Sequence, residues 1–250
     1  ADGSATIIYP LEKNLTRKTK SLVSNHQISK TAPNVTPGGY DSLGLTDVYR
    51  VVSIKDTGVA LDAGPLGTPD FLNITDRYEV DNGQRDNFYG IGRIRLKFDA
   101  TPPVGDLAIV VDYFQHSSGD YFTVDSYSSV DYEYIPAFNS SKGLVQLRDA
   151  LDFRPTKDNT GNNFTGTGAS LVDVIKPGSI IKADLTYYIN RLDKVFVDKY
   201  GNFGIVEGVS ALSPQPPRDP QDSMILYELL VGAFTFGPES INARMIDNRR

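Results

Sequence analysis

Short segments in which apolar and polar residues alternate, separated by turn signals, recur along the whole of this chain. The clearest is Gly92–Phe98 (GRIRLKF), in which Ile, Leu and Phe alternate with Arg and Lys. A period of two residues places one face of a strand in a core and the other in solvent. The 22 glycines and 15 prolines are spread between such segments. This punctuation predicts an all-β fold with short strands, long loops and little helix.

A chain of 250 residues forms one large all-β domain or two ordinary ones. We predict two β-sandwich-like domains, spanning residues 1–140 and 141–250 and joined near residue 140. The first is expected to begin with a strand at Ala5–Leu11, followed by a polar arm or loop that reaches about Asp47.

Several further segments have the β-branched, aromatic or alternating pattern of strands. Leu107–Phe114 is the most apolar of them in the first half of the chain and is therefore the expected central strand there. The others are Val48–Ile54, Phe71–Val80, Gly92–Phe98, Tyr121–Val124, Ile180–Asp198 and Phe203–Glu207. Lys199–Asn202 is read as a hairpin turn and the proline-rich Ser213–Pro220 as an extended connector. Leu144–Phe153 and Met224–Val231 remain open between strand and helix.

Composition excludes several classes of function. The net charge of −6 disfavours binding to nucleic-acid phosphates, so we expect no nucleic-acid partner. The absence of cysteine excludes disulfides, thiolate nucleophiles and zinc–thiolate sites. With only two histidines, His26 and His116, a histidine-rich metal site is not expected either. No apolar run approaches the roughly 20 residues that span a bilayer, so membrane insertion is not expected. We predict no cofactor.

The sequence also lacks the motifs of common catalytic sites, including a nucleophile elbow, a zinc-protease motif and a phosphate-binding loop. Paired carboxylates can hydrolyse glycosides, and Asp131 and Glu133 would share a face if residues 130–134 formed a strand. A solvated face flanked by Tyr132 and Tyr134 explains the same pattern. We therefore predict that the protein is not an enzyme, with a glycan depolymerase as the rival class.

Arg85 and Asp86 follow a turn that also contains Asp81. Arg85 is interpreted as pinning this loop by forked hydrogen bonds, and the alternative is an arginine that contacts a neighbouring subunit. Asp76, Asp81 and Asp86 suggest calcium ligands, but their spacing fits no EF-hand, and aspartates in turns usually cap backbone amides.

Aromatic residues concentrate between Tyr113 and Tyr134. Tyr127, Tyr132 and Tyr134 are candidate interface residues, because subunit interfaces favour tyrosine. Exposed aromatic rings also stack on sugars, which makes a host-receptor or glycan-binding adhesin the alternative function. The favoured interpretation is that these rings alternate between the core and rim of a β-sandwich.

Five strings occur in an order that resembles a family of large, uncharacterised virion structural proteins of contractile-tailed phages, including phages of marine cyanobacteria. The strings are Ile74–Lys97 (ITDRYEVDNGQRDNFYGIGRIRLK), Gly105–Tyr127 (GDLAIVVDYFQHSSGDYFTVDSY), Leu147–Pro155 (LRDALDFRP), Tyr187–Gly208 (YYINRLDKVFVDKYGNFGIVEG) and Pro216–Arg250. The resemblance covers most of the chain from about residue 70 and implies no catalytic residues.

The last part of the chain also resembles the attachment domains of phage tail-fibre and baseplate proteins. An Arg-x-Asp strand, a hairpin, a proline-rich connector and a terminal Asp-x-Arg recur there. The matching positions here are Arg191–Asp193, Asp198–Asn202, Ser213–Pro220 and Asp247–Arg249. Arg191, Asp193, Asp247 and Arg249 are therefore candidate interface or loop-pinning residues.

These resemblances imply a structural component of a phage tail, baseplate or fibre-attachment module, made in the host cytoplasm and located in the virion. Its expected partners are other virion proteins and copies of its own full-length chain, with a host surface glycan as the alternative. The longer relatives continue past Arg250, so the chain is interpreted as a fragment. No heptad seam is present, and we expect this piece to be monomeric or weakly self-associating.

Overall fold

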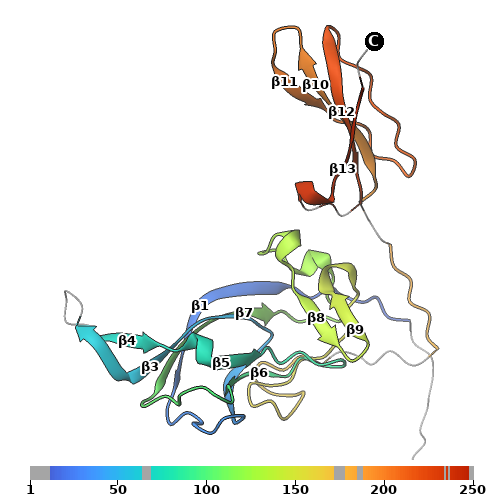
Figure 1. Ribbon diagram of the computed structural model, residues 1–250. Helices are drawn as coiled ribbons and strands as arrows, with labels where there is room; N and C mark the ends of the chain where they lie inside the picture. Colours follow the sequence, from blue (N-terminus) through green and yellow to red (C-terminus); the bar gives the residue numbers. More distant parts are fainter. Residues whose placement is uncertain are drawn as a thin grey trace, which may run out of the picture. The chain divides into compact units, whose positions relative to one another are not determined.

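A computed structural model describes residues 12–63, 69–171, 178–184, 188–233, 235 and 237–247, without the side chains of residues 59–63 and 69–70. The fold is all-β, as predicted: antiparallel strands are joined by loops and by 3-10 helices of three residues (Figure 1). The chain divides into two compact units, Ala1–Ile175 and Lys176–Arg250. Within the described residues, no helix is long and apolar enough to cross a membrane.

The first unit contains two sheets and a hairpin. One sheet has the strand order β1 (Lys20–Lys30), β7 (Leu107–His116), β3 (Val48–Ala63) and β4 (Pro69–Asn73). The other has the order β2 (Tyr40–Thr46), β6 (Ile91–Leu96) and β5 (Tyr78–Asp81), and β8 (Ala137–Ser140) pairs with β9 (Gly143–Gln146). Four 3-10 helices lie in the connections: η1 (Thr75–Arg77), η2 (Val124–Ser126), η3 (Tyr132–Tyr134) and η4 (Leu147–Asp149).

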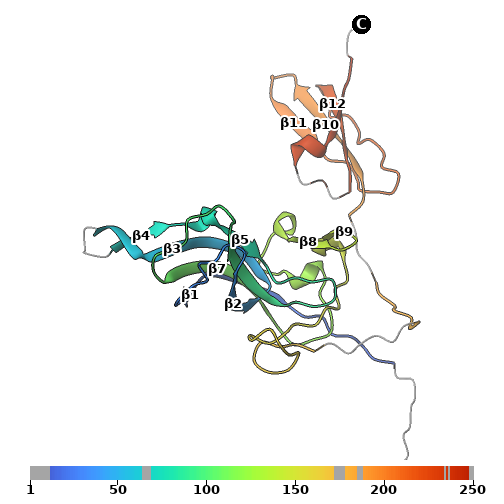
Figure 2. The same cartoon turned by 60° about the horizontal axis from the view of Figure 1, so that its bottom comes forward.

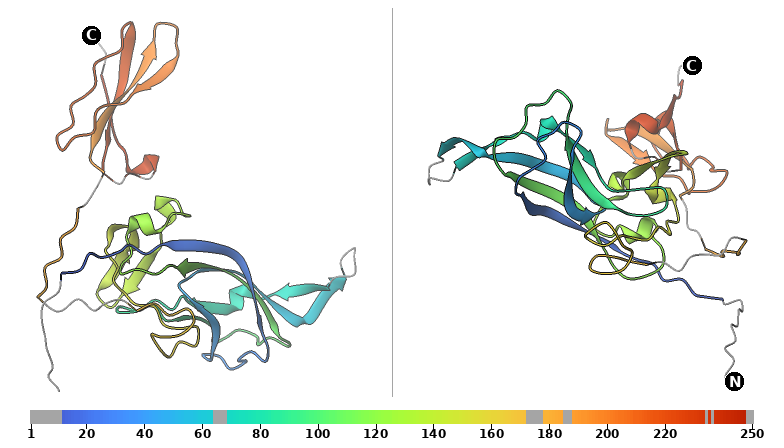
Figure 3. Two further views of the ribbon diagram at one scale, coloured as in Figure 1. Left: turned by 180° about the vertical axis from the view of Figure 1, so that it is seen from behind. Right: turned by 90° about the horizontal axis from the view of Figure 1, so that it is seen from below.

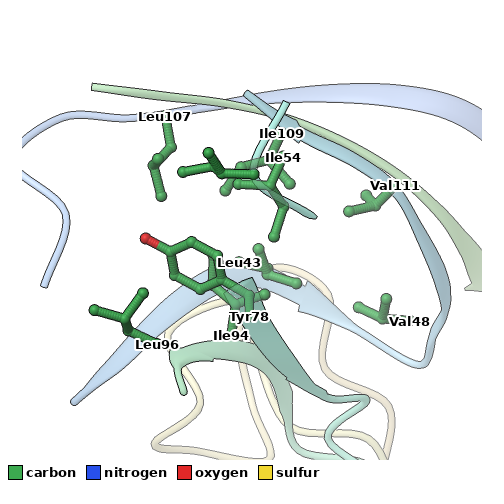
Figure 4. Packing of buried hydrophobic residues seen from close by; sticks show 10 residues of the cluster. Leu43, Val48, Ile54, Tyr78, Ile94, Leu96, Leu107, Ile109 and Val111 are labelled. Carbon is green, nitrogen blue, oxygen red and sulfur yellow. The ribbon is translucent and has the colours of Figure 1, made fainter. Parts of the chain in front are cut away.

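The main core lies between these two sheets, so the first unit is a β-sandwich. Ile54 and Ile109 of one sheet face Ile94 and Leu96 of the other, and all four side chains are buried (Figure 4). β7 lies between β1 and β3, the central position expected for the most apolar strand. The alternation of Gly92–Phe98 ends with the strand at Leu96, which leaves Phe98 86% exposed.

Two parts of the first unit extend beyond this sandwich. A second cluster, formed by Phe114, Tyr127, Ile135, Phe138 and Leu147, lies where β7 and β8 meet the 3-10 helices η2, η3 and η4. At another part of the unit, β3 and β4 pair as a long hairpin that projects away from the sheets (Figure 3).

The expected domain boundary near residue 140 is wrong, because that position lies inside the β8–β9 hairpin. Backbone bridges also join Phe122 to Asp152 and Tyr89 to Thr156, which ties the following segment to the first unit. A short hairpin, closed between Ser140 and Gly143, therefore occupies the position of the expected boundary.

The expected polar arm is also corrected, because residues 20–30 and 40–46 form β1 and β2. β1 pairs with β7 from Lys20 to Lys30, with an irregularity between Val23 and His26. The ladder satisfies the backbone groups of β1 that face β7, while most of its polar side chains remain partly or fully exposed. Tertiary pairing thus overrides a weak local preference for strand. The strand expected at Ala5–Leu11 lies outside the described residues.

The described strands of the second unit form one antiparallel sheet (Figure 2). Its order is β11 (Phe203–Val206), β10 (Arg191–Asp198), β12 (Ser223–Val231) and β13 (Asn242–Met245), with η5 (Pro238–Ser240) in the last connection. The hairpin predicted at Lys199–Asn202 joins β10 to β11, and Gly201 adopts the positive φ of 86° that the turn requires. Met224–Val231 is a strand.

Candidate functional site

The first unit contains a buried network of charged side chains. Lys20 on β1 donates hydrogen bonds to Asp47 (2.6 Å) and to the Tyr89 hydroxyl (2.9 Å). The Tyr89 hydroxyl donates to Asp152 (2.5 Å). Arg154 donates to Asp152 through Nε (2.9 Å) and through a terminal nitrogen (2.7 Å). These contacts connect segments that are widely separated in the sequence.

His116 at the end of β7 extends this network. Its Nε2 lies 2.7 Å from Asp47, and its Nδ1 lies 3.0 Å from the Thr156 hydroxyl. Since an ionised Asp47 can only accept, Nε2 carries the proton and Nδ1 accepts from Thr156. Burial lowers the pKa of His116 below 6.5, although Asp47 acts in the opposite direction. The imidazole is therefore neutral at neutral pH.

Aromatic rings surround the Lys20 ammonium. Its Nζ lies 4.2 Å from the ring centre of Tyr89, 4.6 Å from that of Phe122 and 5.0 Å from that of Tyr127. Burial lowers the pKa of Lys20, and the Asp47 carboxylate opposes this shift. Burial alone would raise the pKa of Asp47, but Lys20 and His116 hold it below its ordinary value. Asp47 is therefore a buried carboxylate that remains ionised.

This network has residues of the types used in acid–base catalysis, but they are buried. Lys20 and Tyr89 are each 0% exposed, and Asp47 is 1% exposed. A substrate could not contact these groups in the described conformation. What the network can do is hold loops together, because a buried polar network with satisfied hydrogen bonds fixes one arrangement of its segments.

Arg85 and Asp86 contact residues of the first unit. Arg85 donates two hydrogen bonds, at 2.9 and 2.7 Å, to the two carboxylate oxygens of Asp81, which is the geometry of a loop-pinning arginine. Arg93 also donates to Asp81 at 2.8 Å, so this carboxylate is engaged by two guanidinium groups. Asp86 is exposed and accepts from the backbone amide of Ser141 at 3.0 Å.

The aromatic segment from Tyr113 to Tyr134 is divided between core and surface. Tyr127 is buried and packs edge-on against Phe114 with ring centres 5.3 Å apart. Tyr132 is half-buried and donates to Asp149 at 2.9 Å. Tyr134 is 58% exposed, and its carbonyl accepts from the Tyr49 hydroxyl. These three tyrosines do not form one exposed platform for a sugar.

Asp131 and Glu133 do not lie on a strand. Glu133 is within η3, Asp131 immediately precedes it, and both side chains are exposed. The strand geometry that would have placed the two carboxylates on one face is therefore not formed.

In the second unit, the Arg-x-Asp pair fixes the start of the sheet. Arg191 donates to Asp193 at 2.9 Å, and Asp193 accepts the backbone N–H of Gly208 at 3.0 Å. Asp193 is 3% exposed. Asp247 is exposed near the end of the described chain, while Arg249 lies outside the described residues.

One face of the second unit's sheet is apolar and exposed to solvent. Directly paired residues of adjacent strands have side chains on the same face of a sheet. Here one such row crosses all four strands, in the order Ile205, Val195, Tyr227 and Met245. We call the set on this side the open face: Val195, Val197, Phe203, Ile205, Met224, Tyr227 and Met245. Phe203 is 76% exposed, Ile205 61% and Met245 69%.

The opposite face is partly covered within the same unit. Lys194 lies on that side and forms an ion pair at 2.5 Å with Asp219 of the proline-rich connector. The Phe196 ring lies against Gly204, where an added Cβ would come within 2.5 Å of the ring. The connector and the Phe196 ring thus shield this side.

The second unit lacks a buried apolar core among its described residues. Asp193 is the one residue of the described part of this unit that is buried. A domain of this size usually needs a hydrophobic core, or a partner that supplies one. The second layer that would complete a sandwich is therefore missing from the described strands.

The comparisons with known proteins add no relative. Neither protein-family models, nor curated proteins, nor solved structures gave a match to this chain. The geometry of the two units is therefore the basis for assigning a function.

Sequence reasoning did not find the open face or the buried network. The alternation of Phe203 and Ile205 with Gly204 and Val206 is visible in the sequence, but it predicts a buried face equally well. The sequence does not indicate that Lys20 and His116 share a site, because they are brought together only by the pairing of β1 with β7.

Proposed function

We propose that this chain is a structural component of a tailed-bacteriophage virion, a module of the tail, the baseplate or a fibre attachment that acts by protein–protein assembly. The observation that carries the proposal is the open face of the second unit. A contiguous exposed apolar face of this kind marks a surface that another protein covers. The resemblance of the sequence to phage virion proteins supplies the biological setting.

The first unit supports the same function. Its sandwich core and buried charge network provide a rigid body. Neither needs a disulfide, since the chain contains no cysteine. Such a body suits a part that is made in the host cytoplasm and then assembled into a particle. Its partners would be other virion proteins and copies of the full-length chain.

The adhesin alternative has less support from the three candidate tyrosines of the segment Tyr113–Tyr134. Among Tyr127, Tyr132 and Tyr134, only Tyr134 is more than half exposed. Sugar-binding platforms need exposed rings, and a single ring offers little stacking area. A glycan array with the purified chain tests this alternative, and saturable binding to one glycan class would favour it.

The main test is whether the chain is part of a particle. Particles of the phage that encodes the chain are purified on a density gradient and analysed by peptide mass spectrometry, with immunogold electron microscopy to locate the protein. We expect its peptides at a fixed ratio to the tail proteins, and gold at the tail. If the chain is found only in the infected-cell lysate and never in particles, the proposal is wrong.

A further inference from the structure

We propose that the open face is a self-association surface, on which a second copy of this chain packs with its own open face. The inference deepens the proposed function, because it names one partner of an assembly module. Each copy would supply the sheet layer that the other lacks, so two single sheets would together form a sandwich.

The character of the open face requires an apolar occupant. Its members are valine, isoleucine, methionine, phenylalanine and tyrosine, and the charged residues that continue the same side of β10, Arg191 and Asp193, are paired with each other. Monomeric proteins rarely leave a contiguous apolar patch larger than roughly 300–600 Å² uncovered, and Phe203, Ile205 and Met245 are each more than half exposed on this one face. A second open face presents the same chemistry over the same area.

The charge distribution favours a second copy over a charged partner. Residues 176–250 contain nine Lys and Arg and nine Asp and Glu, so their formal net charge is zero. Residues 1–175 contain 16 basic and 22 acidic residues and therefore carry the whole net charge of −6. Two copies that meet through their neutral units avoid the repulsion that contact between the acidic units would cause.

Charged side chains at the rim of the open face are already paired within the unit. Lys199 lies 2.9 Å from Asp222 at one end, and Arg191 lies 2.9 Å from Asp193 at the other. These groups need no external counter-charge, so they do not select a strongly charged partner. In a two-fold dimer the same patch of both copies meets, so apolar centre packs on apolar centre and neutral rim lies against neutral rim.

The size of the open face sets the expected affinity. Two such faces would bury on the order of 1,000 Å² in total, which is the lower limit for a specific interface. We therefore expect a reversible dimer with a dissociation constant of about 10 μM, a value typical of weak interfaces. The weak self-association expected from the sequence is thereby assigned to one surface, the open face.

The first experiment is sedimentation equilibrium on the full 250-residue chain over a range of concentrations. The test variant carries Phe203→Thr and Ile205→Thr, which place β-branched residues at both positions of β11 but remove apolar area from the open face. The control carries Val209→Thr and Leu212→Thr, whose side chains are 82% and 78% exposed in the segment between β11 and the connector. Circular dichroism checks that all three proteins have the same strand content.

We expect the wild type and the control to dimerise alike, and the test variant to dimerise at least about ten-fold more weakly. A wild type that stays monomeric at about 200 μM overturns the inference, and so does an equal loss in the control. If a monomeric wild type still binds tail proteins, and the test variant does not, the inference fails while the proposed function stands.

The second experiment identifies the contact directly. Because the chain has no cysteine, Ile205→Cys introduces a single thiol on the open face, and Val209→Cys gives a control thiol at an exposed position between β11 and the connector. A short bismaleimide should cross-link Ile205→Cys into a covalent dimer and leave Val209→Cys largely monomeric. Equal cross-linking of both variants contradicts the proposal. So does an unreactive thiol at position 205 in a monomer, which means that the face is covered within one chain.

Discussion

Individual residues show how charge is kept in the interior of the first unit. The Tyr89 hydroxyl accepts from Lys20 and Arg154 at 2.9 Å each and donates to Asp152. One neutral side chain therefore bridges two cations and an anion. Burial, with Asp47 and Asp152 nearby, raises the pKa of Tyr89, so its hydroxyl remains protonated and able to donate.

Replacing Tyr89 with phenylalanine should reduce the free energy of unfolding by about 2–3 kcal/mol, because three charged groups lose a buried partner. Urea denaturation monitored by circular dichroism measures the change. Tyr134→Phe is the matched control, since Tyr134 is 58% exposed, and its effect should stay within about 0.5 kcal/mol. Equal effects of the two substitutions would show that the buried network adds no stability.

Stability should decrease in mild acid because of His116. Burial lowers the folded-state pKa of His116 below 6.5, so the unfolded chain binds this proton more readily. The stabilisation is present above about pH 6.5 and is lost as the pH falls towards the folded-state pKa, by up to about 1 kcal/mol per pH unit. Urea unfolding at several pH values measures the slope, and His116→Gln should flatten it in this window. An unchanged slope in that variant would assign the effect to another group.

At the scale of elements, sequence reasoning succeeded where a pattern was local. The alternation around Ile94 and Leu96 predicted a strand with one buried face, and both side chains are buried. The apolar run of β7 predicted its central place. The sequence of β1 is mostly polar and does not predict a strand, because its strand conformation is set by the partner β7. Pairing between distant segments leaves no pattern in the local sequence. The buried charge network could not be predicted for the same reason.

The loop between β5 and β6 depends on a glycine. Gly83 has a φ of 82°, and a Cβ at this position would come within 2.3 Å of the Gly90 carbonyl oxygen. Gly83→Ala should therefore reduce the free energy of unfolding by about 3 kcal/mol or more, since it adds a backbone clash to the strain of the left-handed conformation.

Gly44→Ala is the matched control for this prediction. Gly44 has a φ of 68°, and nothing lies within 4 Å of an added Cβ, so this substitution should cost only about 1 kcal/mol. Thermal unfolding of both variants compares them. If Gly44→Ala were the more destabilising of the two, the contact with Gly90 would not explain the requirement for glycine.

At the scale of the whole molecule, the two units differ in how their apolar residues are used. The first unit buries two apolar clusters, whereas the described part of the second unit buries no apolar side chain. Burial of apolar surface is the main stabilising contribution in folding. The two units are therefore unequal in intrinsic stability.

We expect two separate transitions in differential scanning calorimetry, with the second unit unfolding at the lower temperature. If open faces pair, a ten-fold increase in protein concentration should raise the lower transition temperature by a few degrees and leave the upper one unchanged, because mass action stabilises only the associating unit. Phe203→Thr with Ile205→Thr should remove this dependence on concentration. A single transition independent of concentration would contradict the expectation.

The burial of two lysines has a consequence for the reactivity of the chain. Lys18 and Lys20 are both 0% exposed, and burial lowers the pKa of each amine. An acylating reagent consumes the free amine only where it can approach, so these two lysines should stay unmodified while exposed lysines react. Acylation at either position would leave a bulky neutral group where an ammonium now sits. Acylation of Lys18 or Lys20 would therefore show that the chain reacted before it folded. A chain acylated at either lysine could not form the same buried network.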